Sequence, residues 1–544
     1  MTSRSEALRG QVTRNMPEIK KINDLRSTEN IASTPVGAVP LTSGALLARN
    51  ATLNLVTEGW IFLVLIVAMP KLVNFLGHTS FGLFSLAWVV ISYLAFLDVG
   101  VNRAATKFVS EHLAEQDHES TSQIVRTALV ANLTLGLFGG LAVVLLTPYL
   151  VHSVFKVSAD LESQARMTFY AVGLAVPVLL LQGVFRAVLS SFQRFGWINA
   201  VNAVTTTAQW GAAGMLAWKG HGVALVVFST VVARILATAA YGAVLYRLLP
   251  DLQLFRAHGM HGLPRLLRFG SWVTVSQLVS PLLVYLDRVL IASFVSLAAV
   301  TLYTVPYEVM TRLRVIPSSL GNTLYPAFSE RGMVGQQAQL QWLYQGSLRY
   351  LLILMLPGIL FLFVFGTDLM SLWMGTQFAH QTSAILQILA VGALANALAY
   401  VPYNALQALG RPDLTGKFHL LELPLYVLLC VTLIPRWGIG GAALTSTVRF
   451  TLDAGLLFWA AEHYCACSLR SAWRQIVPIM VSGILLGAAM LGAQFFFSTN
   501  GVRLWAGLIA VAIYFLASWR FVLSEREKPA IARALHIFRQ QPAS

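Results

Sequence analysis

RLLRFGSWVTVSQLVSPLLVYLDRVLIASFVSLAAVTLYTVPYEVMTRLRVIPSSLGNTLYPAFSE, residues 265–330, is the stretch that decides the fold. Its apolar runs are long enough to predict two membrane-crossing helices joined by a short turn. Five ionisable residues lie inside or close to these runs, although a charge at membrane depth is costly unless it is paired or faces a wet cavity. They are Asp287, Arg288, Glu308, Arg312 and Arg314. We therefore predict a helical bundle with a polar interior through which something polar passes.

The spacing of the charges and of the prolines fits such an interior. Glu308 and Arg312 are four residues apart, so they share a helix face and can pair with the acid first. Prolines free backbone carbonyls, which membrane helices accept where neighbouring helices or water satisfy them. They stand at Pro281, Pro306 and Pro317. Both features are typical of helices around a hydrated cavity.

The composition places the chain in lipid. Of its 544 residues, 56% are hydrophobic and 11% are charged, whereas a soluble globular protein carries about 25% charged residues. The net charge of +15 would suit nucleic acid, but the basic residues flank apolar runs, as they do in positive cytoplasmic loops. We therefore expect no nucleic-acid partner.

About fourteen apolar runs of roughly 20 residues, the length that crosses a bilayer, divide the chain. Loops rich in Lys and Arg alternate with poorer ones, which predicts that both termini are cytoplasmic. The expected fold class is an all-α integral membrane protein with two pseudo-repeated six-helix lobes and two C-terminal helices. The runs centre on 50–76, 80–106, 122–150, 165–190, 198–218, 222–248, 266–291, 296–326, 345–367, 382–408, 416–435, 437–460, 474–497 and 502–521.

A weak internal repeat supports the two lobes, since many transporters are built from two such halves with the substrate site between them. Lys107-Phe-Val-Ser-Glu111 and its polar loop resemble Ala327-Phe-Ser-Glu330 and its loop, and further similar pairs follow in the same order. The expected domains are a disordered basic cytoplasmic arm over 1–42, an N-lobe over 43–248, a cytoplasmic loop over 249–264, a C-lobe over 265–460, and two helices with a basic tail over 461–544.

Patterns for catalysis or metal binding are missing from the sequence. It has no phosphate-binding glycine loop with its lysine, no histidine pair at metal-ligand spacing and no nucleophile elbow. Its three cysteines lack the second pair that a zinc site needs. His419 and Glu422 share a helix face, which fits a core pair better than a proton relay. We predict a protein that is not an enzyme and has no catalytic residue, cofactor or metal.

Charged residues within the apolar runs are the strongest functional signal. Arginine binds phosphate bidentately and stays charged when desolvated, so several arginines around one cavity suit an anionic substrate such as a pyrophosphate. The candidates for this cationic cavity are Arg103, Arg186, Arg234, Arg288 and Arg312. The candidate carboxylates for a coupling proton or sodium ion, or for a gate, are Glu58, Asp98, Asp287 and Glu308.

Structural explanations compete at some of these positions. Arg103 and Arg186, near the ends of their runs, could reach the membrane interface by snorkelling. Arg449 and Asp453, which are four residues apart, could neutralise each other. The deeper charges, among them Glu58, favour a functional role.

Three segments resemble the polysaccharide-biosynthesis flippases of the multidrug/oligosaccharidyl-lipid/polysaccharide superfamily. The first, Phe96-Leu-Asp-Val-Gly100 followed by Arg103-Ala-Ala-Thr-Lys-Phe-Val-Ser-Glu111, is similar to the family's second-helix pattern. The others are Tyr285-Leu-Asp-Arg-Val-Leu-Ile291 and Leu302-Tyr-Thr-Val-Pro-Tyr307 with Tyr325-Pro-Ala-Phe-Ser329 downstream. The 42-residue basic arm and Glu58 depart from the family pattern.

The resemblance implies two lobes around a central cationic cavity. Such a protein would move an undecaprenyl-pyrophosphate-linked oligosaccharide, an O-antigen or exopolysaccharide unit, across a bacterial inner membrane by alternating access coupled to protons or sodium. The resemblance carries Arg288 and Arg312 over as cavity or gate residues, and Asp98 and Asp287 as acids of the family pattern. A polysaccharide polymerase or export complex would be a further partner.

Three alternatives stand beside this interpretation. A multidrug or cation antiporter of the same superfamily would have about twelve helices and an acidic cavity, so the final helix pair argues against it. A murein lipid precursor flippase shares the helix count and the cationic cavity. A membrane-embedded polysaccharide polymerase or ligase would carry a long extracytoplasmic loop with Arg or His, and the sequence shows none.

Overall fold

The computed structural model describes residues 44–98, 100–248, 279, 281–333, 337–465, 467 and 469–522. Two compact units divide the chain, Met1–Thr52 and Leu53–Ser544. The first is described only from Gly44, where a helix begins. The predicted arm over 1–42, the predicted loop over 249–264 and the basic tail beyond 522 lie outside the described residues. So does the start of the predicted C-lobe.

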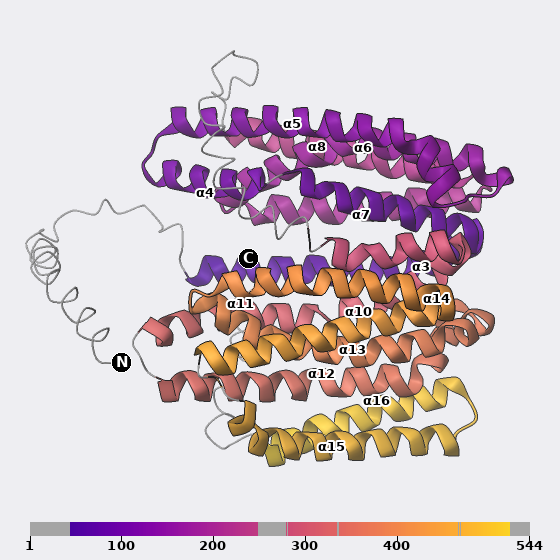
Figure 1. Ribbon diagram of the computed structural model, residues 1–544. Coiled ribbons are helices and arrows are strands. Elements are labelled where there is room, and N and C mark those ends of the chain that lie inside the picture. Colours follow the sequence, from indigo (N-terminus) through magenta and orange to yellow (C-terminus); the bar gives the residue numbers. More distant parts are fainter. Residues whose placement is uncertain are drawn as a thin grey trace, which may run out of the picture. The chain divides into compact units, whose positions relative to one another are not determined.

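Helices make up almost the whole of the described chain, and these residues form no strand (Figure 1). The predicted all-α class is thereby confirmed. An unlabelled helix covers 281–294. The others are α3 (Gly44–Leu94), α4 (Val101–Ala114), α5 (His118–Tyr149), α6 (Ala159–Ser191), α7 (Phe195–Trp218), α8 (Val223–Leu248), α10 (Leu297–Arg312), α11 (Val315–Met333), α12 (Gln337–Met374), α13 (Thr376–Ala408), α14 (Pro412–Cys465), α15 (Leu469–Phe496) and α16 (Asn500–Ala517).

Two of these helices are broken at a glycine with a positive φ angle, a conformation that side chains with a Cβ rarely adopt. α3 breaks at Gly77 (φ 75°) and α14 at Gly438 (φ 56°). Beyond the break in α14, a Cβ on Gly441 would lie 2.2 Å from the Leu433 carbonyl oxygen, so the two arms touch near the turn. The break at Gly77 falls between the runs 50–76 and 80–106, and the break at Gly438 falls at the start of the run 437–460.

The span expected over 296–326 is not one helix, because the structure interrupts it between α10 and α11. Pro317 has no N–H to bond the carbonyl four residues earlier, and its ring collides with that carbonyl. That carbonyl belongs to Leu313, and the helix is interrupted by a turn at Leu313 and Arg314. The Ile316 N–H bonds the Leu313 oxygen instead, at 3.2 Å.

A second expected span, 80–106, is also divided. After α3, a short 3-10 turn over Ala95–Asp98 leads to Gly100, which has a φ of 71° and precedes α4. The Asp98 carboxylate accepts a hydrogen bond of 2.9 Å from the Asn102 N–H. This bond satisfies one of the free donors at the start of α4.

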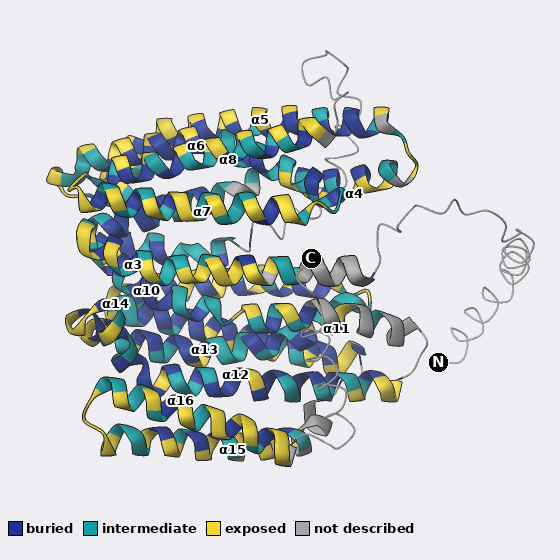
Figure 2. Cartoon of the chain, turned by 180° about the vertical axis from the view of Figure 1, so that it is seen from behind, coloured by how far each residue is buried: buried dark blue, intermediate teal, exposed yellow. Residues whose placement is uncertain are grey.

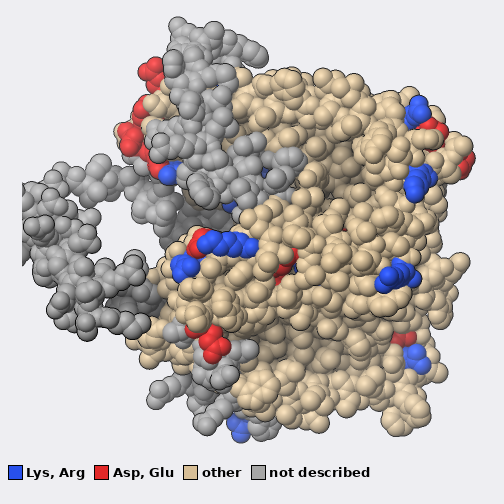
Figure 3. Space-filling view, in the orientation of Figure 1, with Lys and Arg blue, Asp and Glu red and all other residues tan. Residues whose placement is uncertain are grey.

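The outer faces of the helices are apolar. Nine helices of the described chain are long and apolar enough to cross a membrane. Exposed residues run along them (Figure 2), and many of these residues are large hydrophobics. Most of the face drawn in Figure 3 carries neither acids nor bases. The protein is therefore a multi-pass membrane protein. Its fourteen spans and cytoplasmic termini stay predictions.

The labelled helices form two sets. Helices α4–α8, the first helix group, pack against one another, and so do α10–α16, the second helix group (Figure 1). From Leu53 on, α3 bonds to both: Trp60 donates its indole N–H to Thr207 of α7 at 2.9 Å, and Trp373 of α12 donates to the Ile66 carbonyl at 2.7 Å. The lobe boundaries predicted from the sequence stay a prediction.

Candidate functional site

A polar cavity of about 270 Å³ lies where α3, α7, α8, the helix over 281–294 and α10 meet. Helices of both groups therefore line it. Its charged side chains are three arginines and one glutamate, so the lining has an excess of positive charge. The polar and charged lining residues are Ser85, Ser92, Thr206, Gln209, Arg234, Tyr285, Arg288, Thr304, Glu308 and Arg312.

Arg288 is almost fully buried, at 2% exposure, and tyrosine rings surround it. Its guanidinium carbon lies 4.3 Å from the Tyr307 ring centroid, 5.5 Å from that of Tyr285 and 5.8 Å from that of Tyr303. A desolvated cation gains about 2 kcal/mol from such a ring. The rings therefore offset part of the cost of keeping this charge out of water.

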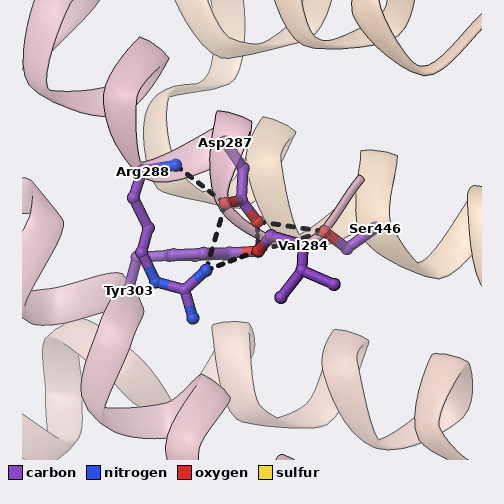
Figure 4. Close-up of polar contacts among 5 residues, drawn as sticks. All are labelled: Val284, Asp287, Arg288, Tyr303 and Ser446. Atoms are coloured by element: carbon purple, nitrogen blue, oxygen red, sulfur yellow. Dashed lines mark hydrogen bonds and ion pairs between the residues drawn. The ribbon is translucent and has the colours of Figure 1, made fainter. Parts of the chain in front are cut away.

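Asp287 is the counter-charge of Arg288, and Figure 4 shows how both are held. One carboxylate oxygen accepts from Arg288 Nη1 at 3.2 Å and from the Arg288 backbone N–H at 2.8 Å. The other accepts from the Tyr303 hydroxyl at 2.5 Å and from the Ser446 hydroxyl of α14 at 3.4 Å. Asp287 thus has a full set of donors, and it orients Arg288 from behind the cavity wall.

Arg312 and Glu308 form the pair that their spacing predicts. Arg312 Nη2 lies 3.3 Å from Glu308 Oε2, and both side chains are about one-third exposed, at 30% and 34%. An ion pair this accessible to solvent contributes little to stability. Either partner can therefore exchange the other for a ligand in the cavity.

Arg234 has no carboxylate partner within ion-pair distance among the described residues. Its guanidinium stacks on Trp88, with its carbon 4.9 Å from the ring centroid, and Nη1 donates to the Gln182 side chain at 3.3 Å. Its Nε is buried without a partner. A cation with spare donors on a cavity wall is suited to bind an anion.

The other predicted site residues lie outside the cavity lining. Arg103 and Arg186 are exposed, although Arg186 is close enough to Arg234 to interact electrostatically. Glu58 is exposed on α3, one turn before the first lining residue. Asp98 is buried at the start of α4. The structure thus brings together Arg234, Arg288, Arg312 and Glu308, with Asp287 behind them.

An apolar slot of about 350 Å³ adjoins the cavity between α3, α10 and α12. Leu65, Met69, Glu308 and Arg312 line both spaces, so the Glu308–Arg312 pair stands at the passage between them. The remaining lining residues of the slot are Phe62, Ile66, Val309, Leu369, Leu372 and Trp373.

Sequence reasoning missed the uncharged part of the site. Trp88 and Gln209 line the cavity, and neither stands in a pattern that separates a lining residue from an ordinary membrane aromatic or amide.

The predicted pairing of Arg449 with Asp453 was wrong. Arg449 meets Glu422 instead, with 4.0 Å between Arg449 Nη1 and Glu422 Oε2. That contact depends on the turn at Gly438, because 27 residues of unbroken helix would hold the two residues about 40 Å apart.

Comparison with known proteins shows the family of the chain. A family model described as "Polysaccharide biosynthesis protein" matches residues 47–331, which include every helix that lines the cavity. The chain belongs to the polysaccharide biosynthesis protein family. The resemblance seen in the sequence is confirmed.

Proteins similar to this chain carry transporter names. A protein of Shigella flexneri that bears the name of an O-antigen transporter is 25% identical over 77% of this chain and 98% of its own length. A Haloferax volcanii protein named as a low-salt glycan biosynthesis flippase is 22% identical over 80% of this chain and 87% of its own.

Solved structures share the fold. The lipid II flippase MurJ in an inward closed conformation matches with a TM-score of 0.68 at 10% identity, over 87% of this chain and 99% of its own. An inward-facing multidrug resistance transporter of the MATE family matches with a TM-score of 0.62 at 13% identity, over 77% and 98%. The chain thus has the membrane transporter fold of these proteins.

Proposed function

We propose that this protein is a flippase, not an enzyme, that moves a polyprenyl-pyrophosphate-linked oligosaccharide across a bacterial inner membrane. The observation that carries the proposal is the pairing of an arginine-lined cavity with an apolar slot. A lipid-linked sugar has an anionic, hydrated head and an apolar tail, so it needs two neighbouring environments of this kind. The names of the relatives, an O-antigen transporter and a glycan biosynthesis flippase, support the same substrate class.

The head of the substrate would bind in the cavity. A pyrophosphate is recognised by charge-assisted, bidentate hydrogen bonds from arginine. Arg234 has an unused donor at Nε, and Arg312 can leave Glu308 at little cost. Arg288, held by Asp287 and the tyrosine rings, adds a fixed positive charge. The sugars would then pass through the water of the cavity.

The tail, still bonded to the head, would extend from the cavity into the bilayer through the apolar slot. A polyprenyl chain is far longer than the slot, so only its first isoprene units would lie there and the rest would stay in the bilayer. Because the Glu308–Arg312 pair lines both spaces, it would stand beside the bond between head and tail. The substrate would then cross by alternating access, coupled to a proton or sodium gradient, and a polymerase or export complex would receive it.

The rival functions fit the cavity less well. A multidrug or cation antiporter would need net negative charge to attract its cargo, whereas arginines outnumber acids in this lining. A murein lipid precursor flippase would carry the same pyrophosphate, and it is separated from our proposal by the names of the relatives rather than by the cavity. A polymerase or ligase would need a catalytic set, which we did not find in the sequence.

Replacing Arg234 tests the role of the cavity. In a host lacking the gene, the wild-type protein should restore the surface polysaccharide, whereas Arg234→Ala and Arg312→Ala should leave the lipid-linked unit on the cytoplasmic leaflet, because the pyrophosphate loses a charged donor. Leaflet-resolved analysis of the lipid-linked sugars measures this. Arg436→Ala, which removes an exposed arginine of α14 outside the cavity, should export normally. Normal export by Arg234→Ala at equal membrane abundance would show that the substrate head does not bind in this cavity.

Filling the slot tests the path of the tail. Leu369→Trp adds bulk to the slot lining and should slow the flipping of a long-chain substrate several-fold, while a short-chain analogue is spared. Rates in reconstituted vesicles, with substrates of two chain lengths, measure this. Leu485→Trp changes an exposed leucine of α15 and serves as the control. Equal slowing for both chain lengths would mean that the tail does not use the slot.

A further inference from the structure

A buried carboxylate in the second helix group plays no part in the cavity. Glu422, on the first arm of α14, faces Arg449 on the second arm, and its side chain is fully buried. Within the described chain, neither carboxylate oxygen of Glu422 receives a hydrogen bond. An ionised carboxylate in this place has lost its hydration shell without gaining donors in exchange. A bound proton would relieve that cost.

The neighbours of Glu422 make a proton the fitting ligand. Asp453, itself buried, and His419 interact electrostatically within the same cluster as Arg449. The two carboxylates and one guanidinium have an excess of one negative charge, and a proton on Glu422 would both cancel it and supply a donor toward Asp453. The other titratable neighbours are three tyrosines and a cysteine: Tyr426 and Cys430 of α14, Tyr403 of α13 and Tyr307 of α10.

A metal ion would fit this cluster poorly. Hard cations such as Mg²⁺ and Ca²⁺ need several oxygen ligands in a shell, and the Arg449 guanidinium, 4.0 Å from Glu422, would repel a cation placed beside it. No group of three or more His, Cys, Asp or Glu residues that could hold a metal ion occurs in the part of the chain that the structure describes.

We propose that Glu422 binds the proton that drives transport, with Asp453 sharing it and Arg449 as the counter-charge. This inference rests on the proposed flippase function. Protonation removes the nearest ion-pair partner of Arg449 and adds one positive charge to the cluster. Tyr307 interacts electrostatically with Arg449 and packs on Arg288 of the cavity. Binding of the proton at Glu422 and binding of the anionic head are therefore coupled through these contacts, and by linkage each changes the affinity for the other by the same factor.

Infrared difference spectroscopy of the purified full chain tests this without any substrate. When the pH is lowered, the wild-type protein should gain the carbonyl band of a buried carboxylic acid, and Glu422→Gln should lose that band. Glu162→Gln, which removes a partly exposed glutamate paired with Arg166, should keep it, whereas Asp453→Asn should shift it to lower pH, because Arg449 alone then balances the charge of Glu422. A band that survives in Glu422→Gln, or that sodium ions abolish at constant pH, would overturn the proposal.

A second measurement uses the wild-type protein alone and so does not depend on whether a variant folds. A hydrophobic carbodiimide adds to protonated carboxyl groups in apolar surroundings, so mass spectrometry of the labelled wild-type protein should find the adduct at Glu422, and more of it at low pH. Labelling of other carboxyl groups with Glu422 unmodified would contradict the proposal. Both readouts report the proton alone, so they can fail while flipping is observed, and flipping can fail while they succeed.

Discussion

Asp287 and Glu308 look alike in the sequence, as acids beside arginines in apolar runs, but their surroundings differ. Asp287 is 1% exposed and accepts four hydrogen bonds, whereas Glu308 is about one-third exposed and forms an ion pair with Arg312. Removing one partner of a buried ion pair leaves an uncompensated charge and costs about 3 kcal/mol or more, while a solvent-screened pair is worth less than about 1 kcal/mol.

We therefore expect Asp287→Asn to lower the free energy of unfolding by about 3 kcal/mol. Glu308→Gln, its matched control, should lower it by less than about 1 kcal/mol. Unfolding of the purified protein in mixed micelles, followed by tryptophan fluorescence, measures both. Equal losses would show that Asp287 is not the structural anchor of Arg288.

The geometry of Arg234 predicts that a positive charge alone at this position is not sufficient for full export. Arg234→Lys keeps a cation but loses the flat stacking on Trp88 and the bond to Gln182, interactions worth roughly 1 to 2 kcal/mol. Export by Arg234→Lys should fall about tenfold, the equivalent of about 1.4 kcal/mol, and so lie between the wild type and Arg234→Ala. Full activity of the lysine variant would mean that the stacking does not matter.

At the scale of elements, α3 stands between the two helix groups near its break. The Thr301 hydroxyl of α10 donates to the His78 carbonyl at 2.6 Å. A Cβ on Gly82 would lie 1.8 Å from the Leu297 carbonyl oxygen, and a backbone atom cannot move aside as a side chain can. Glycine at this position therefore lets α3 approach the start of α10.

Gly82→Ala should hold α3 and the start of α10 apart at this point. If transport alternates between closed and open arrangements of the two groups, the variant should shift the population away from the closed one and lose transport. Distances between spin labels at Lys219 and Val295 measure the shift. Gly59→Ala, at a site on α3 with nothing within 4 Å, should behave as the wild type. Unchanged distances in Gly82→Ala would show that this contact does not govern closure.

Residue patterns predicted the elements better than their interruptions. Apolar runs of membrane length marked the helices because the bilayer demands them. The break at Gly77 falls between two such runs, and the break at Gly438 falls at the start of one. The break before Pro317 and the turn at Gly100 lie inside apolar runs, where hydropathy shows no change. The proline signal was present, but membrane helices often tolerate proline as a kink, and only the structure shows which outcome applies.

At the scale of the whole molecule, the sequence identified the charged residues but not their grouping. Because an unpaired charge in lipid is costly, depth within an apolar run singled out Glu58, Asp287, Arg288, Glu308 and Arg312. The last three line the cavity, whereas Asp287 lies behind its wall and Glu58 lies outside its lining. Arg103 stayed among the cavity candidates although snorkelling could explain it, and the structure leaves it outside the lining that Arg234 joins. That difference depends on which helix face turns toward α3 and α10, and packing between distant segments decides it.

The most direct test of the central claim is a flipping assay with the purified protein in liposomes. The substrate would be a polyprenyl-pyrophosphate-linked oligosaccharide whose sugar a membrane-impermeant glycosidase can cleave only from outside. We predict that wild-type vesicles expose the sugars of the inner leaflet to the enzyme and that Arg234→Ala vesicles do not. If wild-type vesicles expose them no faster than protein-free vesicles, or move an uncharged glycolipid equally fast, the account is contradicted.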